Sequence, residues 1–282
     1  MTDEPLVLSD SPREGVARLT LNRPGARNAQ NLDLIRQLDD GFTAAMRDGS
    51  VKVIVLAANG PDFSAGHDLR QLLDKEDEAR FGEHGSSGNF SAPHHEGYMA
   101  REEEAYIATC RRWRNLTKPT IAQVHGRCIA GGLMLAWVCD LIIAAEDATF
   151  HDPVSAWGGN GLEWFAYPWE FGARKAKEFL FTGDIWTASE AWRLGMVNHV
   201  VPPGELADFT LDLAGRIASK PSFALKAAKQ SVNAALDAQG QPQAIDTAFQ
   251  IHHLTHMRNL LENDGEMVDA KVMPKMWKDR EE

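Results

Sequence analysis

Two kinds of apolar pattern alternate along the first two hundred residues of the chain. One is a short run of β-branched and other apolar residues that ends at a turn signal, as in 51–58, which stops at the letters NGP. The other repeats every three or four positions, which is typical of an amphipathic helix. Strands are predicted at 16–22, 51–58, 120–124 and 141–145, and helices at 32–49 and 131–138. This alternation predicts an α/β protein with a βα core.

The pattern changes in the middle and in the last third of the chain. A further helix is predicted to start near Asp68, and the glycine-, serine- and histidine-rich stretch 82–95 is predicted to be a mobile loop. A charged helix follows, with the run EEE at 102–104 expected on its solvated face. Strand signals thin out after the middle of the chain, and beyond Pro203 the pattern is helical. We therefore expect a core over 1–203 and a helical C-terminal segment over 204–282.

Composition and charge narrow the class of protein. The chain has 282 residues, of which 44% are hydrophobic, and its formal net charge is -11. An acidic chain lacks the basic surface needed to neutralise phosphates, so neither nucleic acid nor an anionic membrane is an expected partner. The three cysteines, Cys110, Cys128 and Cys139, suit a reducing compartment, and the acidic first ten residues do not resemble a signal peptide. A cytoplasmic location is expected.

Three segments contain residues suited to chemistry. In 62–69 (DFSAGHDL), small residues let the backbone approach a ligand, and the N–H of His67 would lie at the start of the expected helix. In 125–134 (HGRCIAGGLM), two adjacent glycines stand between a strand and an apolar helix. Taken alone, either segment also fits an ordinary turn or close helix packing. The glycine-rich, tryptophan-flanked stretch 150–164 fits the wall of a pocket.

In this order and spacing the segments resemble the enoyl-CoA hydratase/isomerase (crotonase) superfamily, over nearly the whole chain. The matching stretches are LNRPGARNAQN at 21–31, FSAGHDL at 63–69, the block 125–150, and 181–202. The resemblance implies a crotonase-like spiral of βαβ units and an acyl-CoA substrate, with no separate cofactor because coenzyme A is part of that substrate. It assigns an oxyanion hole to the backbone N–H groups of His67 and Gly131. It also implies that 204–282 builds a homotrimer or a dimer of trimers.

The sequence departs from the family pattern at both acid/base positions. By resemblance, hydratases carry glutamates where this chain has Met134 and Val154, and neither side chain can activate water or protonate a carbon. Glu163 is the first candidate to replace them, with a structural ion pair as the alternative role. The side chain of His67 comes next, and Asp152 third. A single carboxylate among tryptophans is expected to have its charged form disfavoured.

These residues favour double-bond isomerisation or a related lyase reaction, because isomerisation needs only one base. Decarboxylation, hydration through a replaced base, and a non-catalytic acyl-CoA-binding role are the alternatives. The cluster of Trp157, Trp164 and Trp169 points to a bulky acyl group, although tryptophans also pack cores. Met134 and Val154 are expected to line the same substrate pocket.

The coenzyme A end is assigned by resemblance, and cationic side chains there would pair with phosphate oxygens. The expected contacts are Ala26, Arg27, Ala65, Arg70, Trp277 and Lys278. A few local cations would therefore let an acidic protein bind an anionic ligand. Elsewhere, His252 and His256 stand four apart on a predicted helix, a spacing that can ligate metal. No third ligand is evident in the sequence, so no metal site is expected.

Overall fold

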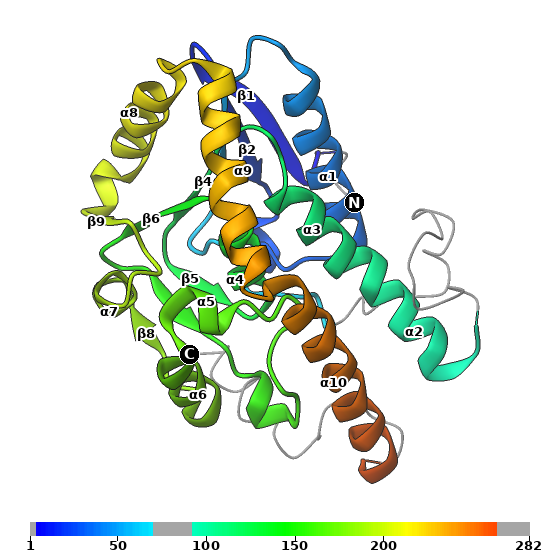
Figure 1. Ribbon diagram of the computed structural model, residues 1–282. Helices are drawn as coiled ribbons and strands as arrows, with labels where there is room; N and C mark the ends of the chain where they lie inside the picture. Colours follow the sequence, from blue (N-terminus) through cyan, green and yellow to red (C-terminus); the bar gives the residue numbers. More distant parts are fainter. Residues whose placement is uncertain (1–3, 70–91, 264–282) are drawn as a thin grey trace.

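The computed structural model describes residues 4–69 and 92–263, and its centre is a six-stranded sheet (Figure 1). The strand order is β1-β2-β3-β4-β6-β9, and every neighbouring pair is parallel except β1 with β2. The strands are β1 Val7–Arg13, β2 Val16–Leu21, β3 Val53–Ala58, β4 Thr120–Val124, β6 Leu141–Ala145 and β9 His199–Val201. All four predicted strands are confirmed. The edge strand β1 was missed because most of its residues are exposed and polar.

Helices cover both faces of this sheet, which explains the continuous apolar runs in its central strands. On one face, Leu19 and Leu56 pack with the apolar stripe of α1 (Leu32–Arg47), which includes Leu38. On the other face, Val53 and Ile143 pack with α8 (Leu206–Ala218). Alternate residues of one strand point to opposite faces, so the two cores are separated by the sheet itself.

A second, three-stranded sheet lies in the order β5-β7-β8 and carries the loop of the third candidate segment. Its strands are β5 Arg127–Ile129, β7 Thr149–His151 and β8 Trp186–Thr187. Between β5 and β6 stands the predicted helix α4 (Gly131–Trp137), all of whose residues are buried. The Thr187 hydroxyl oxygen accepts the N–H of Glu190 at 3.2 Å and so caps the start of α7 (Ala188–Arg193).

After residue 92, α2 and α3 form one continuous rod (Figure 1). The remaining helices follow β7 along the chain and end in a helical C-terminal region. In the rod, a π-helical turn over Glu103–Ala108 joins α2 to α3. The helices are α2 His94–Glu102, α3 Thr109–Arg114, α5 Tyr167–Phe171, α6 Ala173–Thr182, α7 Ala188–Arg193, α9 Ser222–Ala238 and α10 Gln241–Glu262. Across the two described stretches, no helix combines the length and apolar character needed to cross a membrane.

One sequence prediction about the rod is wrong. Glu102 and Glu104 were expected on a solvated face, but they are only 2% and 6% exposed. The π-helical turn and the packing of α10 against α2 bury this segment on both sides, as the contact of His95 with His253 shows. The helix expected after Asp68 and most of the expected loop lie outside the described residues. The end of that loop is helical, because α2 begins at His94.

Candidate active site

The first candidate segment is held beside the start of the chain by two backbone hydrogen bonds. The N–H of Gln30 donates to the carbonyl of Gly66 at 2.7 Å, and the N–H of Asp68 donates to the carbonyl of Gln30 at 2.9 Å. These bonds give a parallel bridge between Gln30 and His67. Since successive peptide groups of an extended chain point to opposite sides, the N–H of His67 points away from Gln30.

Glycines let the second candidate segment pack directly onto the first. A Cβ on Gly131 would lie 2.7 Å from Cε1 of His67, and a Cβ on Gly132 would lie 2.7 Å from the carbonyl oxygen of Ser64. Ala130, just before α4, adopts a φ of 47°, a region that residues with a side chain seldom occupy. A strained turn and two glycines therefore bring the first N–H groups of α4 next to the His67 segment.

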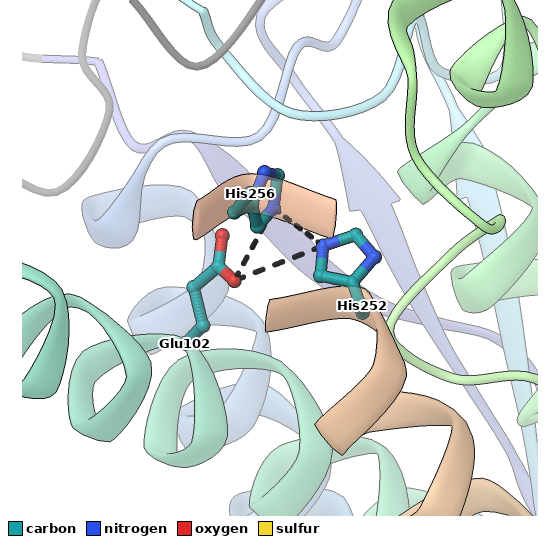
Figure 2. A group of neighbouring side chains, drawn as sticks. All are labelled: Glu102, His252 and His256. Carbon is teal, nitrogen blue, oxygen red and sulfur yellow. Dashed lines mark hydrogen bonds and ion pairs between the residues drawn. The ribbon is translucent and has the colours of Figure 1, made fainter. Parts of the chain in front are cut away.

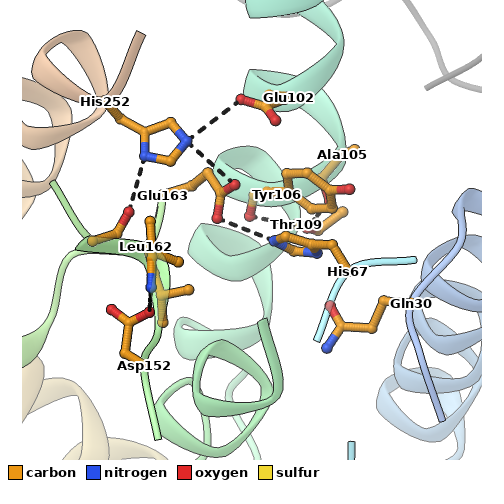
Figure 3. A network of polar contacts seen from close by, with 12 residues as sticks. Gln30, His67, Glu102, Ala105, Tyr106, Thr109, Asp152, Leu162, Glu163 and His252 are labelled. Carbon is orange, nitrogen blue, oxygen red and sulfur yellow. Dashed lines mark hydrogen bonds and ion pairs between the residues drawn. The ribbon is translucent and has the colours of Figure 1, made fainter. Parts of the chain in front are cut away.

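Glu163, which lies in the third candidate segment, faces the side chain of His67 in the first (Figure 3). Its Oε2 lies 3.1 Å from Nε2 of His67, and its side chain is only 5% exposed. The ring of His67 stacks on Tyr106, with 4.0 Å between ring centroids, so the imidazole is fixed from both sides. Burial raises the pKa of Glu163, but the charge and hydrogen bond of His67 outweigh it and lower that pKa overall. The expectation of a disfavoured charged form is wrong.

A second buried carboxylate continues this polar network away from His67. Oε1 of Glu163 lies 3.6 Å from Nε2 of His252, and the same nitrogen lies 3.9 Å from Oε2 of Glu102 (Figure 3). Burial and the charge of Glu163 raise the pKa of Glu102, although the Tyr98 hydroxyl, 2.5 Å from Oε1, acts in the opposite direction. The two carboxyl groups thus differ when no metal cation lies beside them: Glu163 favours the anion and Glu102 the neutral acid.

Sequence reasoning missed the part of this network that comes from α2 and α10. His252 and His256 were noticed for their spacing, and the third donor close to them is Glu102. The expectation of no metal site rested on the lack of a third ligand, and that premise is wrong because a third donor lies within reach. The four-residue spacing of two histidines was a usable signal, but their partner comes from a helix far earlier in the chain.

Asp152 lies in a separate buried polar contact. It is fully buried, its Oδ1 accepts the N–H of Val154 at 3.0 Å, and its Oδ2 accepts the hydroxyl of Tyr167. Burial raises the pKa of Asp152 to about 6, while both hydrogen bonds act to lower it. Met134 is buried within α4, and Val154 starts a short 3-10 turn after Asp152. A proton-transfer role for Asp152 stays a prediction.

The tryptophans differ in their surroundings. Trp164 is buried at 3% exposure, next to Glu163 in the chain. Trp157 and Trp169 are half-buried, and the Trp157 carbonyl accepts from the side-chain amide of Asn259 on α10 at 2.8 Å. Contact of these rings with an acyl group stays a prediction.

Three of the residues assigned to coenzyme A lie together. The N–H of Ala65 donates to the carbonyl of Arg27 at 2.9 Å, directly after Ala26. Asp62 lies 4.0 Å from Nε of Arg27 and also binds Arg127 through two contacts of 2.7 and 2.8 Å. Arg127, which the sequence analysis did not single out, adds a second half-exposed guanidinium beside Asp62. The remaining assigned residues, Arg70, Trp277 and Lys278, lie outside the described residues.

Comparisons with known proteins agree with this architecture. Residues 11–267 match the family described as Enoyl-CoA hydratase/isomerase. A Mycobacterium tuberculosis protein provisionally named enoyl-CoA hydratase EchA13 is 45% identical over 245 residues, which are 86% of this chain and 77% of that protein. Crotonyl-CoA hydratase of Syntrophomonas wolfei is 33% identical over 245 residues, 84% of each chain.

A solved structure shows the same fold. The crystal structure of a probable enoyl-CoA hydratase from Mycobacterium smegmatis aligns with a TM-score of 0.81 at 45% identity, covering 93% of this chain and 98% of that one. The chain therefore belongs to the enoyl-CoA hydratase/isomerase family and has its crotonase-like α/β fold with a helical C-terminal region. Family membership implies an acyl-CoA thioester as the substrate.

Proposed function

We propose that this protein stabilises an enolate of a bulky acyl-CoA and moves a proton with a single carboxylate, so that it acts as a double-bond isomerase or in a related lyase reaction. The observation that supports this proposal most directly is the 3.1 Å distance between Oε2 of Glu163 and Nε2 of His67. His67 is the residue whose backbone N–H is assigned to the oxyanion hole. A carboxylate beside the oxyanion hole can remove a proton next to the thioester and return it elsewhere.

Two backbone donors supply the electrostatic part of this reaction. The N–H groups of His67 and Gly131 would bind the thioester oxygen as it gains negative charge. A preorganised donor of this kind contributes on the order of 3 kcal/mol to barrier lowering. The close packing of Gly131 against the His67 ring supports preorganisation, because it leaves no room even for a Cβ between the two segments.

Glu163 is favoured over the two other candidates for the proton. Its lowered pKa keeps it ionised near neutral pH, the charge state that a base needs, while the ion pair with His67 makes it a weaker base than a free glutamate. Both oxygens of Asp152 are already held by Val154 and Tyr167. The His67 ring is stacked on Tyr106 and hydrogen-bonded to Glu163, an arrangement that suits positioning of the carboxylate.

Hydration through a replaced base is the second candidate function. The names of the relatives in Mycobacterium tuberculosis and Syntrophomonas wolfei favour it, since both are hydratases. By family resemblance the usual glutamate positions hold Met134 and Val154, so Glu163 would have to activate the water. Decarboxylation needs the same two oxyanion donors, and a protein that only binds acyl-CoA would use them without turnover.

Proton exchange into bound acyl-CoA tests the proposal. The wild-type protein, given a mixed library of enoyl-CoA thioesters in deuterium oxide, is expected to incorporate deuterium at the α or γ carbon, read by mass spectrometry. Glu163→Gln removes the base at nearly constant volume and is expected to slow exchange by about 10²- to 10⁴-fold.

Matched controls separate the candidates. Glu170→Gln changes a nearby glutamate in α5 and should leave exchange intact, whereas Asp152→Asn tests the rival carboxylate. Exchange that survives Glu163→Gln but stops in Asp152→Asn would overturn the assignment of the base. Wild-type protein that binds acyl-CoA without exchange or turnover across the library would overturn the enzymatic proposal and support the binding role. Net addition of water would favour hydration.

A further inference from the structure

Three donor side chains from two helices meet in Figure 2, and one of them, His252, also contacts Glu163. His252 and His256 stand one turn apart on α10, and their Nε2 atoms are 2.7 Å apart. Glu102, at the end of α2, places its Oε2 at 3.9 Å from each of these nitrogens. We infer that Glu102, His252 and His256 bind one divalent transition-metal ion, and that zinc is the ion best suited to this donor set.

The distances between the donor atoms fit an ion at bonding distance from all three. A triangle with sides of 2.7, 3.9 and 3.9 Å has its centre about 2.1 Å from each corner, which matches zinc–nitrogen and zinc–oxygen bonds. Tetrahedral coordination needs each pair of ligand atoms about 3.3 Å apart, so on binding the two nitrogens would separate by about 0.6 Å and Oε2 of Glu102 would approach each of them by about 0.6 Å. A rotation of either ring on one helix supplies a movement of that size.

Neighbouring groups already orient two of the three donors. Nδ1 of His252 lies 2.9 Å from the carbonyl oxygen of Gly161, so Nδ1 carries the hydrogen and Nε2 keeps its lone pair. The Tyr98 hydroxyl donates to Oε1 of Glu102, which leaves Oε2 for the ion. Hydrogen bonds of this kind to the outer atoms of ligating side chains are a regular feature of protein metal sites.

The surroundings of the second carboxylate oxygen of Glu102, Oε2, favour a cation as its partner. Glu102 is 2% exposed, and within the described residues its Oε2 accepts no hydrogen bond, although Nε2 of His253 lies 3.3 Å away. A buried polar atom without a partner is costly. Glu102 and Glu163 are two buried carboxylates close together, and a doubly charged cation would balance both.

The inferred ion would lie next to the proposed catalytic carboxylate. An ion about 2.1 Å from Nε2 of His252 can be at most about 5.7 Å from Oε1 of Glu163, because those two protein atoms are 3.6 Å apart. A water in the fourth position would bridge the ion and Glu163 if the ion lies within about 4.8 Å of Oε1, the sum of a metal–oxygen bond and a hydrogen bond. Three protein ligands and one open position are typical of catalytic zinc sites. The three ligands stand independently of the reaction proposed above.

Metal titration of the full-length chain tests the inference. Protein stripped with a chelator and titrated calorimetrically with Zn²⁺ is expected to bind one ion per chain, and elemental analysis should give the same ratio. Glu102→Gln and His256→Gln should each weaken binding by at least about 100-fold. His199→Gln, which changes an exposed histidine on β9, should bind as the wild type does.

A variant that keeps all three ligands tests the inference even if the ligand substitutions prevent the protein from folding. Tyr98→Phe keeps all three ligands but frees the Glu102 carboxylate to turn, so it should weaken binding by about 10-fold. The visible spectrum of the Co²⁺-loaded protein should show tetrahedral coordination and lose it in Glu102→Gln. No ion bound at micromolar Zn²⁺, or equal binding by wild type and folded Glu102→Gln, would overturn the inference. Isotope exchange measured on metal-free protein is a separate readout of the proposed reaction.

Discussion

Replacing Tyr167 with phenylalanine removes one hydroxyl from a fully buried polar contact near the site. That hydroxyl donates to Oδ2 of Asp152 and accepts the N–H of Leu162 at 2.9 Å. The ring stays packed in its place, 4.9 Å from Trp137 and 4.8 Å from Phe165 between centroids. The substitution therefore tests the hydrogen bonds with little change in packing.

The pKa of Asp152 gives the size and the pH dependence of the effect. Burial raises this pKa to about 6, above the value in the unfolded chain. The neutral acid therefore stabilises the fold fully below about pH 4, and this stabilisation of about 3 kcal/mol is lost as the pH rises through 6. Tyr167 acts to lower the pKa, so its removal raises the pKa further and increases the loss at high pH.

Two contributions make up the expected loss in Tyr167→Phe. The unpaired N–H of Leu162 costs about 1–3 kcal/mol at every pH. The lost hydrogen bond to ionised Asp152 costs about 1.5–3 kcal/mol more, but only above about pH 6, where the wild-type carboxylate is charged. The variant should therefore be destabilised at pH 5 and destabilised more strongly at pH 8.

Urea unfolding at pH 5 and pH 8 measures both contributions. The matched background is Asp152→Asn, whose side chain cannot ionise. In that background, adding Tyr167→Phe should cost the same free energy of unfolding at both pH values. An equal loss at pH 5 and pH 8 in the original background would refute the assignment of a titrating, buried Asp152.

Two further substitutions test the packing that positions the site. Gly132→Ala places a Cβ 2.7 Å from the Ser64 carbonyl oxygen, so it should cost about 1–3 kcal/mol of stability and weaken acyl-CoA binding, measured by calorimetry. Gly204→Ala, with open space around the new Cβ, is its control, and equal behaviour of the two would contradict the close approach. Asp140→Asn removes the negative charge 2.8 Å from Lys229, whose side chain is buried while that of Asp140 is 25% exposed, so urea unfolding should show a loss of about 1–3 kcal/mol. No measurable loss would contradict a stabilising ion pair.

The sequence predicts the central strands and α1 well because the information is local. Each central strand is an apolar run with a turn signal at its end, and the sheet buries it on both faces. The edge strand β1 carries no such run, since only one side of it pairs and its side chains are mostly in water. Its position depends on pairing with β2, which local patterns do not report.

The site was predicted in part, for the same reason. The small residues around His67 and the glycines of α4 mark a close backbone approach, and the family resemblance gives that approach a role. The burial of Glu102 could not be read from the EEE run, because its neighbours come from α10. The lowered pKa of Glu163 likewise depends on His67 and His252, which are distant in sequence.

The last described helix, α10, sets the order in which the site can be completed during synthesis. Strands β1 to β7 and α4 lie before residue 152, but His252 emerges about 100 residues later. Since domains generally fold from the N-terminus during translation, a nascent chain could assemble its oxyanion segments while Glu102 and Glu163 still lack partners from α10. The two acidic groups would then lack the histidines of α10, and only Glu163 would have a histidine partner, His67.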